Sequence, residues 1–253
     1  MTNGSSIDAS SRTDDKHQRR TVLATGFSLL LMALLAPLAQ FGVLKTLIVP
    51  ADAAATTTNI AASLGLFQTA IVAFLVVAIL DVAVAWGFYL LLRPIDKGLA
   101  LMVASLRIVY AAIFALALLN LVNAARLVDT AAGTALQSAP LQAQVAVSVA
   151  SFDTGWHLAL GIFGLHLVGL GILLFRFAAP RLLAALVTLA GIGYLADSIG
   201  TIFVAGYGLT ISTFTFVGEA LLIFWLFWRA ARGSRTSGSA VASPDPASAA
   251  VAS

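Results

Sequence analysis

Four ionisable residues of this chain lie deep inside long apolar runs, where such residues are rare. They are Asp81, Arg107, His166 and Glu219. Each stands ten to twelve residues from a basic residue at one end of its run. At a helical rise of about 1.5 Å per residue, all four lie at a depth of about 15–18 Å. Because ionisable groups are costly in a bilayer, this shared level indicates either a functional site or a buried ion-pair network.

The formal charges of these four residues do not balance. Asp81 and Glu219 carry two negative charges, and the guanidinium of Arg107, which keeps its proton, carries one positive charge. One negative charge is therefore left over unless a carboxyl stays protonated, His166 is protonated, or a cation binds. Each of these would make the cluster a titratable or ligand-responsive site. Such a site suits the binding or translocation of a small polar or ionic ligand, as in a coupled transporter or a sensor.

Two more polar residues are expected above this level. Asp197 lies about 24 Å from Arg181 along its run, and Tyr194 is on the same helical face one turn below it. We include both in the candidate ligand-binding site or polar network. The full set of candidate residues is Asp81, Arg107, His166, Tyr194, Asp197 and Glu219.

Two other interpretations of the cluster remain open. In the first, Arg107 pairs with Asp81 or Glu219 in a purely structural network, or one that serves a partner protein, with polar contacts between membrane helices contributing about 1 kcal/mol each. Structural and functional ion pairs look the same in a sequence.

In the second, the protein is an intramembrane enzyme, because a histidine with two carboxylates can act as acid and base or bind a metal. His157 and His166 are nine residues apart, on opposite faces of one helix, so they cannot share a metal. The chain also has no cysteine and no His-Glu-x-x-His motif. We therefore expect no metal and no cofactor, and enzymatic activity is the less favoured hypothesis.

The composition is that of an integral membrane protein. The 253 residues are 60% hydrophobic and only 10% charged, with a mean hydropathy of +0.99. The apolar runs are continuous, which favours an all-α bundle over a barrel of alternating strands. We predict six membrane-spanning helices, at about 21–44, 67–92, 98–124, 153–175, 181–205 and 210–228.

The basic residues set the orientation of these spans. Of the 14 Lys and Arg residues, eleven fall on the side that holds both termini, and only Lys45 and Arg126 fall on the other side. This bias predicts that both termini are cytoplasmic in a multi-pass protein of the cell membrane. The net charge of +3 follows from the same bias. The lipid bilayer is thus the expected partner and nucleic acid is not, while the oligomeric state is left open by the sequence.

The chain divides into one membrane domain and two tails. We expect residues 1–20 and 231–253, which are poor in large apolar residues, to be disordered cytoplasmic tails, and residues 21–230 to form the domain.

Asp52 is a typical N-cap for a short helix in the first outer loop. The third loop, at about 126–152, could carry an interfacial helix over 141–150. Pro37 is expected to kink the first span.

The fourth span is rich in glycine. Gly161, Gly164 and Gly171 fall near one face, which favours close helix packing and a central position for this span. His166 is then expected to face the interior of the bundle. Trp156 lies near the end of the same span, where tryptophan is typical of an interfacial anchor.

Several short motifs, taken in order, resemble a bacterial family of six-helix membrane proteins known as domain of unknown function 4386. The resemblance covers roughly residues 20–230. It implies the six-helix fold and no established activity, substrate or cofactor. The motifs that carry it are Ile48-Val49-Pro50 with Asp52 and Asn59, Asp81, Tyr89-Leu90-Leu91-Leu92-Arg93-Pro94, Arg107, Phe163-Gly164-Leu165-His166-Leu167 with Gly169, Gly193-Tyr194-Leu195-Ala196-Asp197-Ser198, and Gly218-Glu219.

Overall fold

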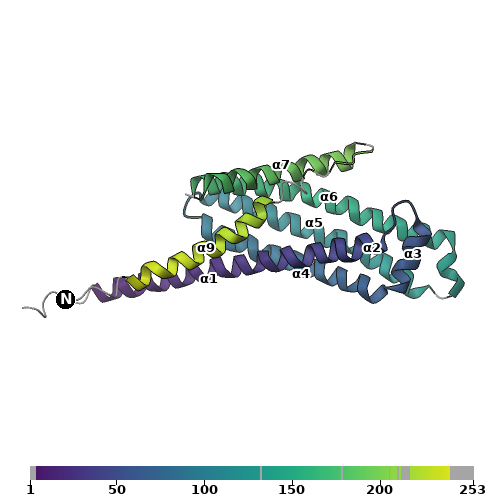
Figure 1. Cartoon of the computed structure of the whole chain (residues 1–253), viewed down its shortest axis with the longest axis horizontal. Helices are drawn as coiled ribbons and strands as arrows, with labels where there is room; N and C mark the ends of the chain where they lie inside the picture. The colour runs from purple at the N-terminus through teal and green to yellow at the C-terminus, as the bar shows by residue number, and fades with distance from the viewer. Residues whose placement is uncertain are drawn as a thin grey trace, which may run out of the picture.

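The computed structural model of the protein describes an elongated bundle of helices (Figure 1). It describes residues 4–131, 133–177, 179–204, 206–209, 211 and 217–239. All regular secondary structure in these ranges is helical, which confirms the all-α prediction. The helices are α1 (Gly4–Pro37), the π-helix η1 (Leu38–Leu44), α2 (Lys45–Leu47), α3 (Ala53–Ala62), α4 (Leu64–Leu92), α5 (Lys97–Thr130), the 3₁₀ helix η2 (Gly133–Gln137), α6 (Ala139–Arg176), α7 (Arg181–Phe203) and α9 (Val217–Ser239).

Within the described residues, five helical stretches are long and apolar enough to cross a membrane. They are Gln18–Leu47, which runs from α1 to α2, and the helices α4, α5, α6 and α7. These five stretches coincide with the first five predicted spans and indicate a multi-pass integral membrane protein. The sixth predicted span, 210–228, falls partly on residues outside the described ranges. Its second half lies in α9, and the span itself stays a prediction.

Both ends of the described chain lie at the same end of the bundle. Figure 1 shows the start of α1 and the last turns of α9 side by side there, while α3 lies at the opposite end. The connection between α4 and α5 lies at the same end of the bundle as the two termini. There Asp96 accepts a hydrogen bond of 2.9 Å from Arg176 of α6. We call these the termini end and the α3 end. The assignment of the termini end to the cytoplasm stays a prediction from the basic residues.

The first and last helices extend into the segments that the sequence assigns to the tails, and the division into a domain and two tails stays a prediction. The helix α1 begins at Gly4, inside the segment 1–20 that was expected to be disordered, and α9 continues to Ser239, beyond 231. Hydropathy marks only the part of a helix that is in contact with lipid. A helix that has already formed in the membrane can continue into water, because its nucleation is complete.

Pro37 does interrupt the first span. It is the last residue of α1, and the π-helical turns of η1 follow it directly. Because proline has no backbone N–H and clashes with the preceding turn, the regular hydrogen-bond pattern cannot continue unchanged through it.

The first outer loop is held by its own polar side chains. Asp52 is the N-cap of α3, as predicted, since its Oδ1 accepts a hydrogen bond of 2.8 Å from the Ala55 backbone N–H. The Thr56 hydroxyl accepts a bond of 2.9 Å from the Val49 N–H, and the Asn59 amide donates to the Leu47 carbonyl at 3.2 Å. These bonds connect α3 to the end of α2.

The prediction of a separate interfacial helix over 141–150 is wrong. These residues form the first turns of α6, which runs unbroken from Ala139 to Arg176. Pro140 is well suited to a first helical turn, and no further proline follows before the end of the helix.

The same extension changes the position of Trp156, which lies well inside α6 and not at its end. The Trp156 ring packs against Phe74, Phe114 and Phe152, with centroid distances of 5.1, 5.5 and 5.3 Å. It is therefore part of an aromatic group formed with α4 and α5, and its role as an interfacial anchor stays a prediction.

The helix α6 is central, as its glycines predict. Gly161, Gly164 and Gly171 all face α7, since a Cβ atom added at any of them would meet α7 atoms. The closest approach to the α7 backbone is at Gly164, where a Cβ would lie 2.6 Å from the Gly191 carbonyl oxygen. On the α5 side, a Cβ at Gly169 would lie 2.6 Å from the Val103 side chain. Glycines on two faces thus allow α6 to lie closely between α5 and α7, and this packing places His166 inside the bundle.

Candidate functional site

The centre of the site is an ion pair between two neighbouring helices. The Nη2 atom of Arg107 on α5 lies 2.7 Å from Oδ1 of Asp81 on α4. Both residues are almost completely buried, with exposed fractions of 2% and 0%. At this distance and burial, the guanidinium and the carboxylate form a buried ion pair. Either charge alone would carry a large desolvation cost.

His166 of α6 is the third member of this group. Its Nε2 lies 3.1 Å from Nη1 of Arg107, and its Nδ1 lies 2.8 Å from the Val103 carbonyl oxygen. Arginine can only donate, so Nε2 must accept, and Nδ1 then carries the hydrogen and donates to the carbonyl. These partners assign the neutral tautomer. Protonation of His166, one of the three ways to balance the charges, would direct an N–H at the guanidinium and does not fit.

An aromatic ring completes the surroundings of the guanidinium. The Cζ of Arg107 lies 5.2 Å from the ring centroid of Phe163. The same ring stacks on His166, with a centroid distance of 5.6 Å. A cation above a ring face is attracted by about 0.5–2 kcal/mol, and this attraction further stabilises the guanidinium of Arg107 in this position. We call Asp81, Arg107 and His166 the buried triad.

The triad is not fully satisfied by hydrogen bonds. Both carboxylate oxygens of Asp81 and the Nε of Arg107 are buried and lack a hydrogen-bond partner within the described part of the chain. The contact between Nη2 and Oδ1 is therefore a close ion pair and not a well-directed hydrogen bond. A buried polar atom without a partner costs about 1–3 kcal/mol. The unsatisfied atoms of the triad could therefore still accept or donate a hydrogen bond at this level of the bundle.

Glu219 reaches the same level from α9. It lies in the first turn of that helix, and its neighbour Gly218 fixes how closely α9 approaches α7. A Cβ at Gly218 would lie 2.5 Å from the Leu186 carbonyl oxygen, so a larger residue would push α9 away. The Glu219 carboxyl is close enough to interact electrostatically with Arg107 and Asp81. Its Oε1 is buried and has no hydrogen-bond partner among the described residues.

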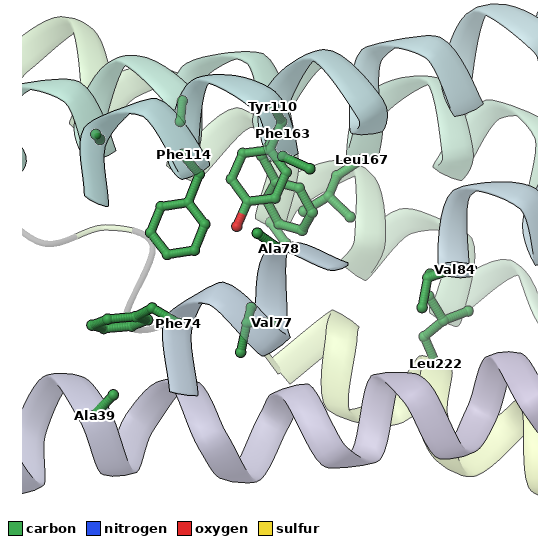
Figure 2. Close-up of a cluster of buried hydrophobic side chains, with 14 of the residues drawn as sticks. Ala39, Phe74, Val77, Ala78, Val84, Tyr110, Phe114, Phe163, Leu167 and Leu222 are labelled. Carbon is green, nitrogen blue, oxygen red and sulfur yellow. The ribbon is translucent and has the colours of Figure 1, made fainter. Parts of the chain in front are cut away.

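Two tyrosines stand beside the carboxylates. The Tyr194 hydroxyl of α7 is within hydrogen-bonding reach of the Glu219 carboxyl. Tyr110 lies one turn beyond Arg107 on α5 and interacts electrostatically with Asp81, Arg107 and Glu219. Figure 2 shows its hydroxyl directed towards Ala78, one turn before Asp81 on α4. Both rings pack against Phe163, with centroid distances of 4.8 Å for Tyr110 and 5.4 Å for Tyr194.

Tyr110 was not among the candidate residues predicted from the sequence. Its position three residues after Arg107 puts it on the same face of α5, and this spacing could have identified it. Hydropathy alone did not identify Tyr110 as a site residue, because a tyrosine in an apolar run is usually a packing residue.

Asp197 lies one turn beyond Tyr194 on α7, towards the α3 end. Its Oδ1 accepts a hydrogen bond of 2.7 Å from the Tyr207 hydroxyl and one of 3.0 Å from the Ile211 backbone N–H. The bond to the carboxylate raises the pKa of Tyr207, which lies outside the helices, above its ordinary value. Asp197 thus lies next to Tyr194, and its two hydrogen bonds connect α7 to Tyr207 and Ile211, which follow it in the chain.

The six candidate residues therefore form two connected groups. Asp81, Arg107 and His166 are in direct contact as the buried triad. Glu219, Tyr194 and Asp197 continue from it along α9 and α7. Residue types and depth predicted that side chains from separate helices could meet, and the geometry shows which of them do.

Comparison with known proteins identifies the family of the chain. The model of the family described as domain of unknown function DUF4386 matches residues 24–230. The chain belongs to this family. A relative from Archaeoglobus fulgidus, described as an uncharacterized protein, is 35% identical over 157 residues, which cover 62% of this chain and 80% of the relative. That relative is archaeal, whereas the sequence motifs resembled bacterial proteins. No solved structure matches the chain.

Proposed function

We propose that this member of the DUF4386 family binds a small cation, which can be a proton, at Glu219 inside the membrane. One observation carries the proposal. The positive charge nearest to Glu219 belongs to Arg107, and that guanidinium is already in close contact with Asp81 and His166. The Glu219 carboxyl is therefore left without a cation of its own.

The energetics favour an occupied site. A carboxylate that is removed from water without a partner costs several kcal/mol, even after the protein relaxes around it. Glu219 avoids this cost if it takes up a proton or binds a cation. The Oε1 of Glu219 and the Oδ2 of Asp81, which have no hydrogen-bond partner among the described residues, supply acceptor atoms at the same level.

The charge count also limits the kind of cation. The triad is neutral when His166 is neutral, so Glu219 leaves a net charge of minus one, which a proton or a monovalent cation balances. The described residues contain no group of three or more His, Asp or Glu side chains that could hold a metal ion. The proposed ligand is for these reasons monovalent.

The triad itself supports a second, structural function. Asp81, Arg107 and His166 connect α4, α5 and α6 by contacts of 2.7 and 3.1 Å and have almost no exposed surface. We propose that this group holds the three helices in register and keeps Arg107 from neutralising Glu219. Transport of the cation across the membrane is a further step, which a flux assay in vesicles would test.

Thermal unfolding of the purified protein in lipid nanodiscs tests the binding proposal. The unfolding midpoint is measured in choline chloride and in lithium, sodium and potassium chloride, at acidic and at alkaline pH. We expect at least one of these cations to raise the midpoint at alkaline pH, because only the ionised carboxylate binds a cation. At a cation concentration of about 100 times the dissociation constant, the gain is about 2.7 kcal/mol.

The matched variants are Glu219→Gln, which keeps the size and removes the charge, and Asp153→Asn at an exposed carboxylate of α6. Glu219→Gln should abolish both the cation effect and its dependence on pH, and Asp153→Asn should preserve them. A protein whose midpoint is independent of cation and pH, or a Glu219→Gln variant that still responds fully, would refute the proposal.

A further inference from the structure

From Glu219, a series of hydroxyl and carboxyl groups continues towards the α3 end, within the part of the chain that the structure describes. On α7, Tyr194 faces Glu219 and Asp197 follows one turn nearer to the α3 end. Asp197 then accepts bonds from Tyr207 and Ile211, which follow α7. A path of oxygen atoms thus leads from the level of the triad along α7 towards the α3 end.

In the direction of the termini end, the interior next to the triad is apolar. Side chains from the three helices α4, α6 and α9 fill it, and all have exposed fractions of 3% or less. Figure 2 shows two of them, Val84 and Leu222, on the side of the cluster away from Phe74 and Phe114. The full set is Val84, Phe88, Leu170, Leu174, Leu222 and Leu226. These six side chains offer a polar ion no partner. The buried Thr25 hydroxyl at the level of Gly87 donates its hydrogen to the Thr21 carbonyl of its own helix.

The space between α4, α5 and α6 towards the α3 end is also closed. It is filled by the aromatic group of Phe74, Phe114, Phe152 and Trp156, in which neighbouring rings meet edge to face or tilted. Phe74 and Phe114 have exposed fractions of 0% and 1%. The route along α7 is therefore the one that offers polar contacts.

From this asymmetry we infer that Glu219 exchanges its cation with the solution on the α3 side of the membrane, with Asp197 as the outer acceptor and Tyr194 as the group that positions the ion between them. This inference rests on the proposed function. When the ion is a proton, the net step moves one proton between the Glu219 carboxyl and the solution, and the Asp197 carboxylate holds it in between. The other charged or titratable groups that face Glu219 are Asp81 from α4 and Arg107 and Tyr110 from α5, while His166 from α6 stays neutral.

Carbodiimide labelling in sealed vesicles tests from which side Glu219 is reached. Dicyclohexylcarbodiimide crosses membranes and reacts with protonated carboxyls in apolar surroundings, so its rate of attachment to Glu219 reports protonation. The protein is reconstituted, and its orientation is measured with a membrane-impermeant thiol reagent on a single introduced cysteine, which is possible because the chain has none. The pH is then set independently on the two sides, and modification of Glu219 is quantified by mass spectrometry.

We expect labelling of Glu219 to follow the pH on the α3 side and to be insensitive to the pH on the termini side. Labelling that follows the termini side, or both sides equally, would overturn the inference while leaving cation binding at Glu219 intact. Labelling that is the same at every pH on both sides would instead refute the proposed function, and the inference with it.

Two variants test the route itself. Asp197→Asn keeps an oxygen that can accept the bonds from Tyr207 and Ile211 but removes the charge, and Tyr194→Phe removes the hydroxyl. Because a positioned proton-transfer group contributes about 10²–10⁴-fold, we expect each variant to slow the response of Glu219 labelling to a pH jump on the α3 side by about tenfold or more. The control is Asp129→Asn, at an exposed carboxylate of α5 near the same end, which should respond at the wild-type rate. Wild-type rates in both test variants would rule out the route along α7.

Discussion

The guanidinium of Arg107 on α5 contacts three side chains of the neighbouring helices α4 and α6. It lies 2.7 Å from Asp81 and 3.1 Å from His166, and it stands over the ring of Phe163. Burying such an ion pair does not by itself stabilise a protein, because the desolvation cost can exceed the attraction. Removing only one partner is different, since it leaves the other charge buried alone.

Removal of Arg107 should therefore destabilise the protein more than removal of the whole pair. We expect Arg107→Ala to cost about 3–5 kcal/mol, and the double variant Asp81→Ala/Arg107→Ala to lose less than the sum of the two single variants. Unfolding of the purified proteins by a denaturing detergent measures all four corners of this cycle. Strictly additive losses would show that the two side chains are not coupled.

The two bonds of His166 make a second prediction at this scale. His166→Phe keeps a ring of similar shape but leaves the Val103 carbonyl and one Arg107 nitrogen without partners, so it should cost about 1–3 kcal/mol. The neutral tautomer also predicts that the wild-type imidazole shows one nitrogen with a hydrogen and one without in ¹⁵N NMR spectra. An imidazole with a hydrogen on both nitrogens would contradict the assignment.

The residues of the triad were predictable because depth along a helix follows from counting. The tautomer of His166 was not predictable, because it depends on a backbone carbonyl of another helix. Tyr110 was also missed, since nothing in an apolar run separates a tyrosine that packs from one that faces a carboxylate.

At the scale of the helices, backbone contact between α6 and α7 positions the site. Gly164 and Gly191 face each other so closely that a Cβ on either would lie 2.6 or 2.5 Å from the carbonyl oxygen of the other. A methyl group cannot be accommodated against a backbone oxygen without moving the helix. The position of Tyr194 relative to His166 therefore depends on these two glycines.

Alanine at these glycines should separate the two helices. We expect Gly164→Ala and Gly191→Ala to destabilise the protein by about 1–3 kcal/mol, as overpacking does. Gly65 on α4 is the matched control, because nothing lies within 4 Å of a Cβ at that position. Gly65→Ala should be neutral or stabilising by up to about 1 kcal/mol. Thermal midpoints compare the three variants, and equal effects would exclude a special contact between α6 and α7.

The lengths of the helices were harder to predict than their presence. Hydropathy located the first five spans, since it reports the lipid-exposed part of each helix. It could not show that α6 extends back to Ala139 or that α1 begins at Gly4, because these turns are formed by polar and small residues.

At the scale of the whole molecule, the two ends of the described chain share one end of the bundle, and eleven basic residues were predicted on that side (Figure 1). The side of the membrane from which Glu219 is reached depends on this orientation.

Single cysteines introduced into the cysteine-free chain measure that orientation in cells. We expect a cysteine at Thr58 of α3 to react with an impermeant reagent from outside, and one at Arg20 of α1 to react only after the cells are opened. The reverse pattern would place the α3 end in the cytoplasm and invert the sidedness of the whole account.

The state of the Glu219 carboxyl is the most direct test of the central claim. Infrared difference spectra of the wild-type protein minus Glu219→Gln isolate the signal of this carboxyl, and they can be recorded with and without monovalent cations at several pH values. We predict the band of a protonated carboxyl at acidic pH without cations, and its replacement by a carboxylate signal when the pH or the cation concentration is raised. A Glu219 that is ionised under every condition and indifferent to cations would contradict the claim that its charge is left uncompensated beside the pair of Asp81 and Arg107.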